Sequence, residues 1–172
     1  MTAPGPKMLN TANRGLFWVP TIANLKAPTV AEVTAGINIT CLITAANYSF
    51  GITGNAEIKD PAMCDKIDAS DPGIATVVAE ADFFRFKNAI DDTGWSTFTG
   101  KDIYGFLVER TGQIADGEDQ ETAPVKAADE VKVAAVITHD PQTLSPSTAG
   151  YEKFKQVFSP QNYEARAVVA AA

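Results

Sequence analysis

The sequence predicts a mainly β protein, built as an antiparallel β-sandwich or half-open barrel with one short flanking helix and long loops. Runs of aromatic and β-branched residues recur along the chain and are separated by turns rich in Gly, Pro and Asp. In several of these runs apolar and polar residues alternate, which is the period of a strand with one buried face. No strand–helix alternation favours a parallel α/β sheet.

The N-terminal elements carry the clearest local signals. A strand is predicted at residues 15–22, GLFWVPTI, where Pro20 has no backbone N–H and therefore marks an edge or an end of that strand. Thr29 and Glu32 have the spacing of a capping box, which predicts the short helix. Gly36 follows as a fitting left-handed stop for this helix.

Six more strands follow from the same criteria, which makes about seven in total. They are predicted at residues 37–43, 50–59, 73–87, 102–110, 131–138 and 151–158. Two long loops are predicted, one at the Asp-Pro-rich residues 59–73 and one at 112–122. Residues 91–100, which contain Trp95, are expected to form a polar turn.

The strand at residues 73–87 has an uneven alternation. Its alanines share a face with Phe83, while Glu80 and Asp82 lie on the opposite face. At Phe84 the phase reverses, which predicts a bulge or a strand that leaves one environment for another.

The chain of 172 residues is long enough for one domain with a sizeable core. We expect an extended arm at residues 1–13, a β-domain at 14–158 and an extension that leaves the domain at 159–172. Neither a signal peptide nor an apolar run long enough for a membrane helix is visible, so we expect no contact with a membrane.

Charge and motif content argue against several function classes. A net charge of −7 disfavours a protein that grasps nucleic acid, because phosphate binding depends on Lys and Arg. His139 is the one histidine, and phosphate-binding, nucleophile-elbow and metal-ligand motifs are absent from the sequence. We therefore expect no catalytic residue, no metal and no cofactor. Cys41 and Cys64 are expected to be reduced thiols in the core.

The stretch FWVPTIANLKAPTVAEVTAGINITCLI, at residues 17–43, carries a resemblance to a known family. It is similar to the start of the major tail tube proteins of long-tailed, non-contractile (siphovirus-type) bacteriophages that infect actinobacteria. The order of the later strands is also similar, through DIYGFLVER to VFSPQNYEARAVVAA. Residues 48–73 depart from the family pattern.

This resemblance implies a structural virion protein and no enzyme. Family members form six-membered rings that stack into the tail tube, and DNA passes through the tube during ejection. The implied partners are other copies of the chain, a tape measure protein and a tail terminator, with DNA only in transit. The implied location is the virion tail, assembled in the host cytoplasm.

The resemblance implies that residues 14–43 serve in assembly, as a strand, a docking helix and a second strand. We expect Glu80 and Asp82 to face the lumen, where carboxylates repel phosphate. Phe17 and Trp18 are neighbours in a strand, so one is expected in the core and the other against a neighbouring subunit or the helix. The candidate subunit or ring contacts are Phe17, Trp18, Thr29, Glu32 and Trp95.

Two alternatives stay open on the sequence alone. One is a related tube or head–tail structural protein, such as a tail terminator or the tube of a contractile injection system. The other is a ligand-binding β-barrel or a hydrolase.

Overall fold

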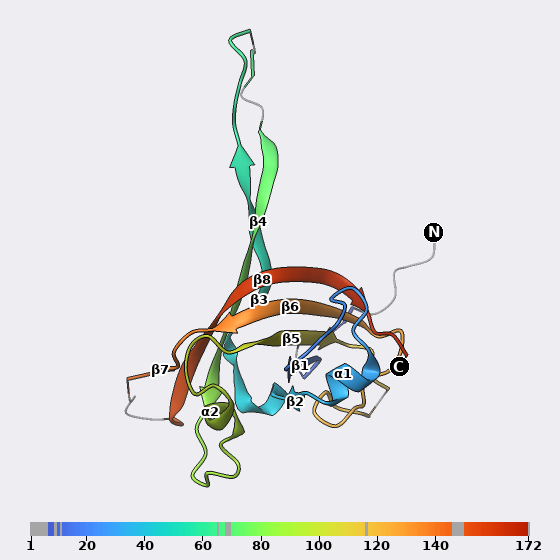
Figure 1. Ribbon diagram of the computed structural model, residues 1–172, viewed down its shortest axis with the longest axis vertical. Helices are drawn as coiled ribbons and strands as arrows, with labels where there is room; N and C mark the ends of the chain where they lie inside the picture. The colour runs from blue at the N-terminus through green and yellow to red at the C-terminus, as the bar shows by residue number, and fades with distance from the viewer. Residues whose placement is uncertain are drawn as a thin grey trace.

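The strands form one antiparallel sheet in a computed structural model that describes residues 7–8, 10, 12–64, 66–67, 70–115, 117–145 and 150–171. The strand order is β2-β1-β5-β6-β8-β4-β3, and the short β7 pairs with β8 (Figure 1). The bounds are Arg14–Val19 (β1), Ile37–Asn38 (β2), Ile43–Ile58 (β3), Asp71–Phe84 (β4), Tyr104–Thr111 (β5), Glu130–Thr138 (β6), Gln142–Thr143 (β7) and Lys153–Val168 (β8). The sheet curls without closing, with β2 and β3 at its ends, and this confirms the predicted mainly β, half-open architecture.

Apolar side chains pack on both faces of β1, β5 and β6. The aromatic core contains Leu16, Trp18, Ile39, Ala79, Ala81, Phe83, Phe98, Leu107, Ala134, Val136, Phe154 and Phe158. The valine core lies on the other face of β1, β5 and β6 and contains Phe17, Val19, Ile22, Val33, Val108, Val125, Val131, Val133, Ala167 and Val169. Because β1 contributes alternate residues to the two cores, it is buried on both of its faces.

Because both faces of β1 are buried, both Phe17 and Trp18 are buried within their own chain. Phe17 and Trp18 do face opposite ways, Phe17 into the valine core and Trp18 into the aromatic core. Their exposed fractions are 7% and 5%, so both side chains are buried within their own chain. Phe17 shares its core with Val33 of α1, which is the helix contact that the sequence offered as one alternative.

The predicted helix is α1, Val30–Thr34, and its capping box is confirmed. The Thr29 backbone N–H donates to the Glu32 carboxylate over 2.8 Å, and the Glu32 N–H donates to the Thr29 hydroxyl over 3.2 Å. Gly36 follows, but the expected left-handed conformation was wrong, because its φ is not positive. Glycine is needed there for space: a Cβ would lie 2.6 Å from the Trp18 carbonyl oxygen.

Residues 37–43 do not form one strand, although their alternation predicted it. Only Ile37–Asn38 pair with β1, after which the chain makes a 3₁₀ turn at Thr40–Leu42 and enters β3 at Ile43. The Leu16 N–H donates to the Thr40 hydroxyl over 2.9 Å and holds this turn against β1. The segment therefore crosses from one edge of the sheet to the other. Its apolar residues pack into or against the aromatic core along the way.

The segment at residues 91–100 is a second short helix rather than only a turn. The helix α2, Thr93–Thr97, covers the aromatic core, and Phe98 directly after it is fully buried. Trp95 packs edge-on against Phe154 with ring centroids 5.0 Å apart. These aromatic residues explain why a polar-looking segment folds back onto the sheet.

The last strand continues well past residue 158, where the sequence placed its end. In β8, Lys153 to Phe158 pair with β4, and Phe158 to Val168 pair with β6. Pro160, which reads as a strand breaker, sits at an irregularity in the β6 pairing, where a missing N–H is tolerated. Residues 159–168 are thus part of the sheet here and not an extension that leaves it. The arm at 1–13 stays a prediction, because residues 1–6, 9 and 11 lie outside the described residues.

Candidate assembly surfaces

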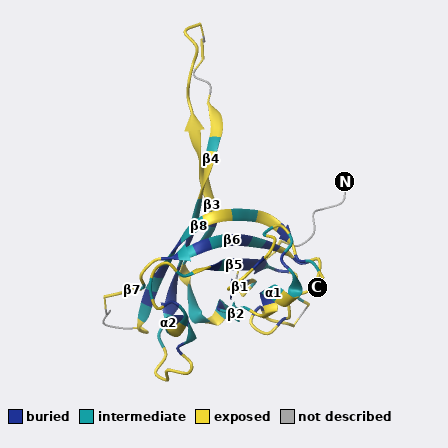
Figure 2. Ribbon diagram, viewed as in Figure 1, coloured by how far each residue is buried: buried dark blue, intermediate teal, exposed yellow. Residues whose placement is uncertain are grey.

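The β3–β4 hairpin projects far from the rest of the protein (Figure 1). β8 pairs with β4 only at residues 79–84, so the outer part of β4 pairs with β3 alone. Figure 2 shows this outer part as almost wholly exposed. Large apolar side chains on it are at least half exposed, namely Ile52, Ile58, Met63, Ile67 and Ile74. An isolated hairpin is marginally stable and exposed apolar clusters mark contact sites, so this hairpin is a candidate assembly surface.

Glycines and bulges give the hairpin its shape. Register shifts occur between Ile52 and Gly54 and between Asn55 and Glu57, which increases the local twist. Gly51 has a φ of +130°, a conformation that other residues rarely adopt. The sequence suggested a weak strand at residues 50–59 because these glycines interrupt it, whereas the structure uses them to bend one continuous strand.

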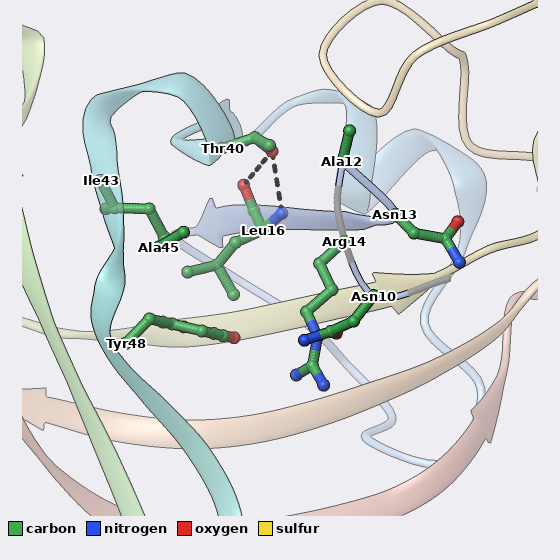
Figure 3. Close-up of a pocket in the computed structure, with 9 residues that line it drawn as sticks. All are labelled: Asn10, Ala12, Asn13, Arg14, Leu16, Thr40, Ile43, Ala45 and Tyr48. Carbon is green, nitrogen blue, oxygen red and sulfur yellow. Dashed lines mark hydrogen bonds between the residues drawn. The ribbon is translucent and has the colours of Figure 1, made fainter. Parts of the chain in front are cut away.

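A hollow of about 330 Å³ lies at the open side of the half-barrel, between β1 and the start of β3 (Figure 3). Arg14 and Leu16 line it from β1, and Ile43 and Tyr48 line it from β3. The register of β3 against β4 shifts between Ile43 and Tyr48, so this part of β3 is bulged. At the hollow, β3 therefore has backbone groups that lie outside the regular β3–β4 ladder.

A buried carboxylate ties the two edges together next to this hollow. Glu109 on β5 is 1% exposed. It accepts hydrogen bonds from Tyr48 over 2.6 Å, Lys132 over 2.5 Å and Arg14 over 3.2 Å. Burial, followed by the nearby Glu109 charge, raises the pKa of the Tyr48 hydroxyl far above its usual range. The network joins β3 to β1, β5 and β6 across the opening of the barrel.

We expect Tyr48→Phe to lower the free energy of unfolding by about 1.5–3 kcal/mol near pH 7, because a hydrogen bond to a charged acceptor is lost. The folded chain holds the Tyr48 proton above pH ~10, whereas the unfolded chain releases it. Stability of the natural protein therefore falls as pH rises above ~10. Denaturant titrations at several alkaline pH values should show a shallower decline in the variant. If the free energy of unfolding of the variant fell with pH as steeply as that of the natural protein, this role for Tyr48 would be contradicted. Part of the fall should remain in the variant, because burial also raises the pKa of Tyr163.

A second buried charge, Arg110, fixes the long loop after β5. Its guanidinium donates to the side chain of Gln120 over 2.9 Å and to the carbonyls of Ala123 and Pro124 over 2.9 and 2.8 Å. Asp129 lies 3.5 Å away and supplies the opposite charge. Sequence reasoning gave Arg110 no role, although an arginine closing an apolar strand before a polar loop was a usable signal.

Within the described residues, no group of three or more His, Cys, Asp and Glu side chains could hold a metal ion. Over the same residues, no helix is long and apolar enough to cross a membrane. His139 is exposed, with its Nε2 2.6 Å from the Ser159 hydroxyl oxygen. Cys41 and Cys64 are both exposed free thiols, so their expected place in the core was wrong.

A comparison with protein-family models matches the phage tail tube protein family over residues 1–172, the entire chain. The chain belongs to this family. A comparison with curated proteins found no match. The family membership confirms the part of the resemblance that concerns phage tail tube proteins. A phage tail tube protein is a structural component of the virion tail that assembles with its own copies, which argues for contact surfaces rather than a catalytic site.

In this tail tube protein, the two acids expected to face the lumen do share a face of β4, but their surroundings differ. Glu80 is half-buried and lies 2.8 Å from the Lys155 ammonium of β8. Asp82 is 3% exposed and accepts a hydrogen bond from the Asn47 side chain over 2.6 Å. Glu80 is therefore partly accessible to solvent, whereas Asp82 is covered within its own subunit.

The proposed contact residues of the tail tube protein are largely engaged within the chain. Phe17 and Trp18 are buried, as described above. Glu32 caps α1 and also accepts from the Ala23 N–H over 2.9 Å, while Thr29 forms a parallel bridge with Ala170. Trp95 is half-buried, with the Arg85 guanidinium 4.0 Å from its ring centroid. The residues that sequence reasoning missed are the exposed apolar ones on the β3–β4 hairpin.

Proposed function

We propose that this tail tube protein closes into six-membered rings, and that the rings stack into the tube through which phage DNA is ejected. The family match along the entire chain carries this proposal. A siphovirus-type tail, an actinobacterial host and assembly in the host cytoplasm belong to the same proposal. So do a tape measure protein inside the tube and a terminator at its end.

The open sheet supports ring closure. β3 at one end of the sheet is long, and its outer edge has no partner strand among the described residues. A long exposed edge invites pairing with another chain, and a closed ring would satisfy it without uncontrolled growth. The projecting hairpin supports stacking, because its apolar side chains extend beyond the body of the subunit.

The face of β4 that carries Glu80 is the proposed lumen surface. The opposite face of β4 supplies Ala79, Ala81 and Phe83 to the aromatic core, and no residue of β4 belongs to the valine core. This face therefore lies outside both cores. Glu80 and Lys155 form an ion pair on it, so a carboxylate and an ammonium would alternate around the channel.

We expect Glu80→Lys to leave tubes intact and to slow DNA ejection, because two lysines would then stand side by side and attract phosphate. Ejection should recover as salt rises. The control is Glu80→Gln, which removes the ion pair without adding a cation. The measurement is the rate of DNA release from particles with intact tails, over a series of salt concentrations. Normal release by Glu80→Lys at low salt would show that residue 80 does not line the path. Asp82 is left unchanged, because a lysine at a 3% exposed site would disrupt the fold.

Electron microscopy of the purified full chain tests the proposed function directly. Rings with six-fold end views, or stacked tubes with a central channel, are the expected result. A protein that remains a monomer at high concentration and over a range of salt would overturn it. A single layer of rings that never stacks would instead favour a terminator-like protein.

A further inference from the structure

An aromatic pocket lies at the end of β4 that is far from the hairpin. The hollow has a volume of about 510 Å³ and is lined by Phe84, Phe86, Tyr151 and Cys41, with Arg85 and Lys87 beside them. Phe86 is 38% exposed and Tyr151 is 80% exposed. Phe84 and Tyr151 meet edge to face, with centroids 5.9 Å apart. Exposed aromatic rings around a hollow are typical of a contact site for another molecule.

We propose that this aromatic pocket receives the outer end of the β3–β4 hairpin of a second copy of the chain. The inference rests on the proposed self-assembly and adds which two surfaces meet. The hairpin end, defined here by Ile58, Met63, Cys64 and Ile67, is exposed and apolar. Methionine suits an aromatic pocket, because its flexible thioether packs well against ring edges.

The two surfaces lie at opposite ends of one strand. β4 runs from the hairpin at Asp71 to the pocket at Phe84, and Figure 1 shows these ends far apart along the longest axis. Fourteen extended residues span roughly 45 Å, so a chain cannot reach its own pocket with its own hairpin. Contact between unlike surfaces at opposite ends is head-to-tail, and such contacts repeat without limit along an axis. This is the geometry that a stack of rings requires.

Charge complementarity favours the same pairing. The segment at residues 59–71, KDPAMCDKIDASD, contains four Asp and two Lys, which gives it a net charge of −2. At the pocket, Lys87 and Lys153 add positive charge, and the Lys153 ammonium lies 5.5 Å from the Phe84 ring centroid. Glu152 offsets one of these charges, and Arg85 is already paired with Asp92 over 2.8 Å. The remaining positive charge at the rim is opposite in sign to the net charge of the sequence at residues 59–71.

The chain's two cysteines mark the two surfaces, which makes a direct test possible. Cys64 is on the hairpin end and Cys41 lines the pocket, and both thiols are exposed. Assembled tubes of the full chain are treated with copper–phenanthroline as oxidant, or with a flexible bis-maleimide, and run on a non-reducing gel. The oxidation is run near pH 9, because burial and then Glu121 raise the pKa of the Cys41 thiol, whereas the bis-maleimide is used at neutral pH, where it does not react with lysine amines.

Docking predicts a ladder of covalent multimers from the natural protein. Cys41→Ser and Cys64→Ser tubes should each give monomer alone, whereas mixed tubes of the two variants should give dimers and nothing larger. A ladder that persists in either single variant would overturn the pairing, because like thiols would then be adjacent. Intact tubes that never cross-link would also overturn it and would leave the proposed function standing. Failure of the natural protein to form tubes would count against the proposed function itself.

A substitution gives an independent check. Met63→Glu should raise the concentration needed for assembly ~tenfold or more, because a charge would enter the aromatic pocket. Unfolding of the monomer should not change, since Met63 is fully exposed. The control is Ile90→Glu, at another highly exposed apolar residue that does not line the pocket. Equal weakening by both variants, or no effect of Met63→Glu, would contradict the docking.

Discussion

Replacing Arg110 with Met is expected to lower the free energy of unfolding by about 3–5 kcal/mol. The guanidinium is fully buried, and its loss would leave the Gln120 side chain and two loop carbonyls without their donor. Asp129, 7% exposed, would become a buried carboxylate without its cation. Methionine keeps most of the volume, so the cost reports the hydrogen bonds and the charge rather than a cavity.

Urea denaturation of the Arg110→Met variant provides the measurement. Arg166→Met is the matched control, because Arg166 is exposed on β8 and its loss should change stability by less than about 0.5 kcal/mol. If the two variants lost similar amounts, Arg110 would not be fixing the loop. Proteolysis should also attack the Arg110→Met protein first within residues 112–129, since the loop would detach before the sheet unfolds.

Truncating Trp18 to Ala should cost about 3–5 kcal/mol, because its ring packs against Phe98 and Phe158 at centroid distances of 5.1 and 5.9 Å. Phe17→Ala should cost a similar amount, although the alternation alone suggested that only one of the two would matter for folding. Both substitutions should destabilise the fold, because both faces of β1 are buried within the chain. Thermal and urea unfolding of the two variants measure this loss of stability. A Phe17→Ala protein of full stability that fails to assemble would contradict this account.

Gly105 offers a sharper control on the Trp18 packing. A Cβ at position 105 would lie 2.4 Å from the Trp18 ring, so Gly105→Ala should destabilise the protein. In the Trp18→Ala background that clash is absent, and the added methyl should cost much less. Gly54→Ala, where nothing lies within 4 Å of the new Cβ, should show no such coupling. Strict additivity of the Gly105 and Trp18 changes would show that the ring does not lie over this glycine.

The sequence predicted those elements whose interactions join residues that are close together in the chain. The capping box of α1 follows from Thr29 and Glu32 alone, since the atoms involved are three residues apart. The phase change at Phe84 correctly marked a change of environment, because β4 ends there and Phe86 lies outside the sheet. The mainly β class followed from alternation in several separate runs, so no single misassigned run could alter it.

Elements that depend on distant partners could not be predicted in this way. The 3₁₀ turn at Thr40 exists because its hydroxyl meets the backbone of Leu16, and alternation carries no information about that contact. The second half of β8 looks polar because its outer face is exposed, although Ala167 beneath it is fully buried. The acids on β4 illustrate the same limit, since only the fold reveals that Asn47 covers Asp82 while Glu80 stays accessible.

The position of β8 in the sheet has a consequence for how the chain folds during synthesis. β8 is synthesised after the other strands of the sheet, yet it lies between β6 and β4 and, among the described residues, is the only strand that joins the β3–β4 hairpin to the rest of the sheet. Until it emerges, β4 and β6 each expose an unpaired edge, and the body of the subunit cannot be completed. Folding of the sheet must therefore wait for β8 and then close contacts that are distant in sequence, which is a slow step. A chain that lacks β8 would consequently lack a finished subunit surface, so only chains that include β8 would be competent to join a growing tube.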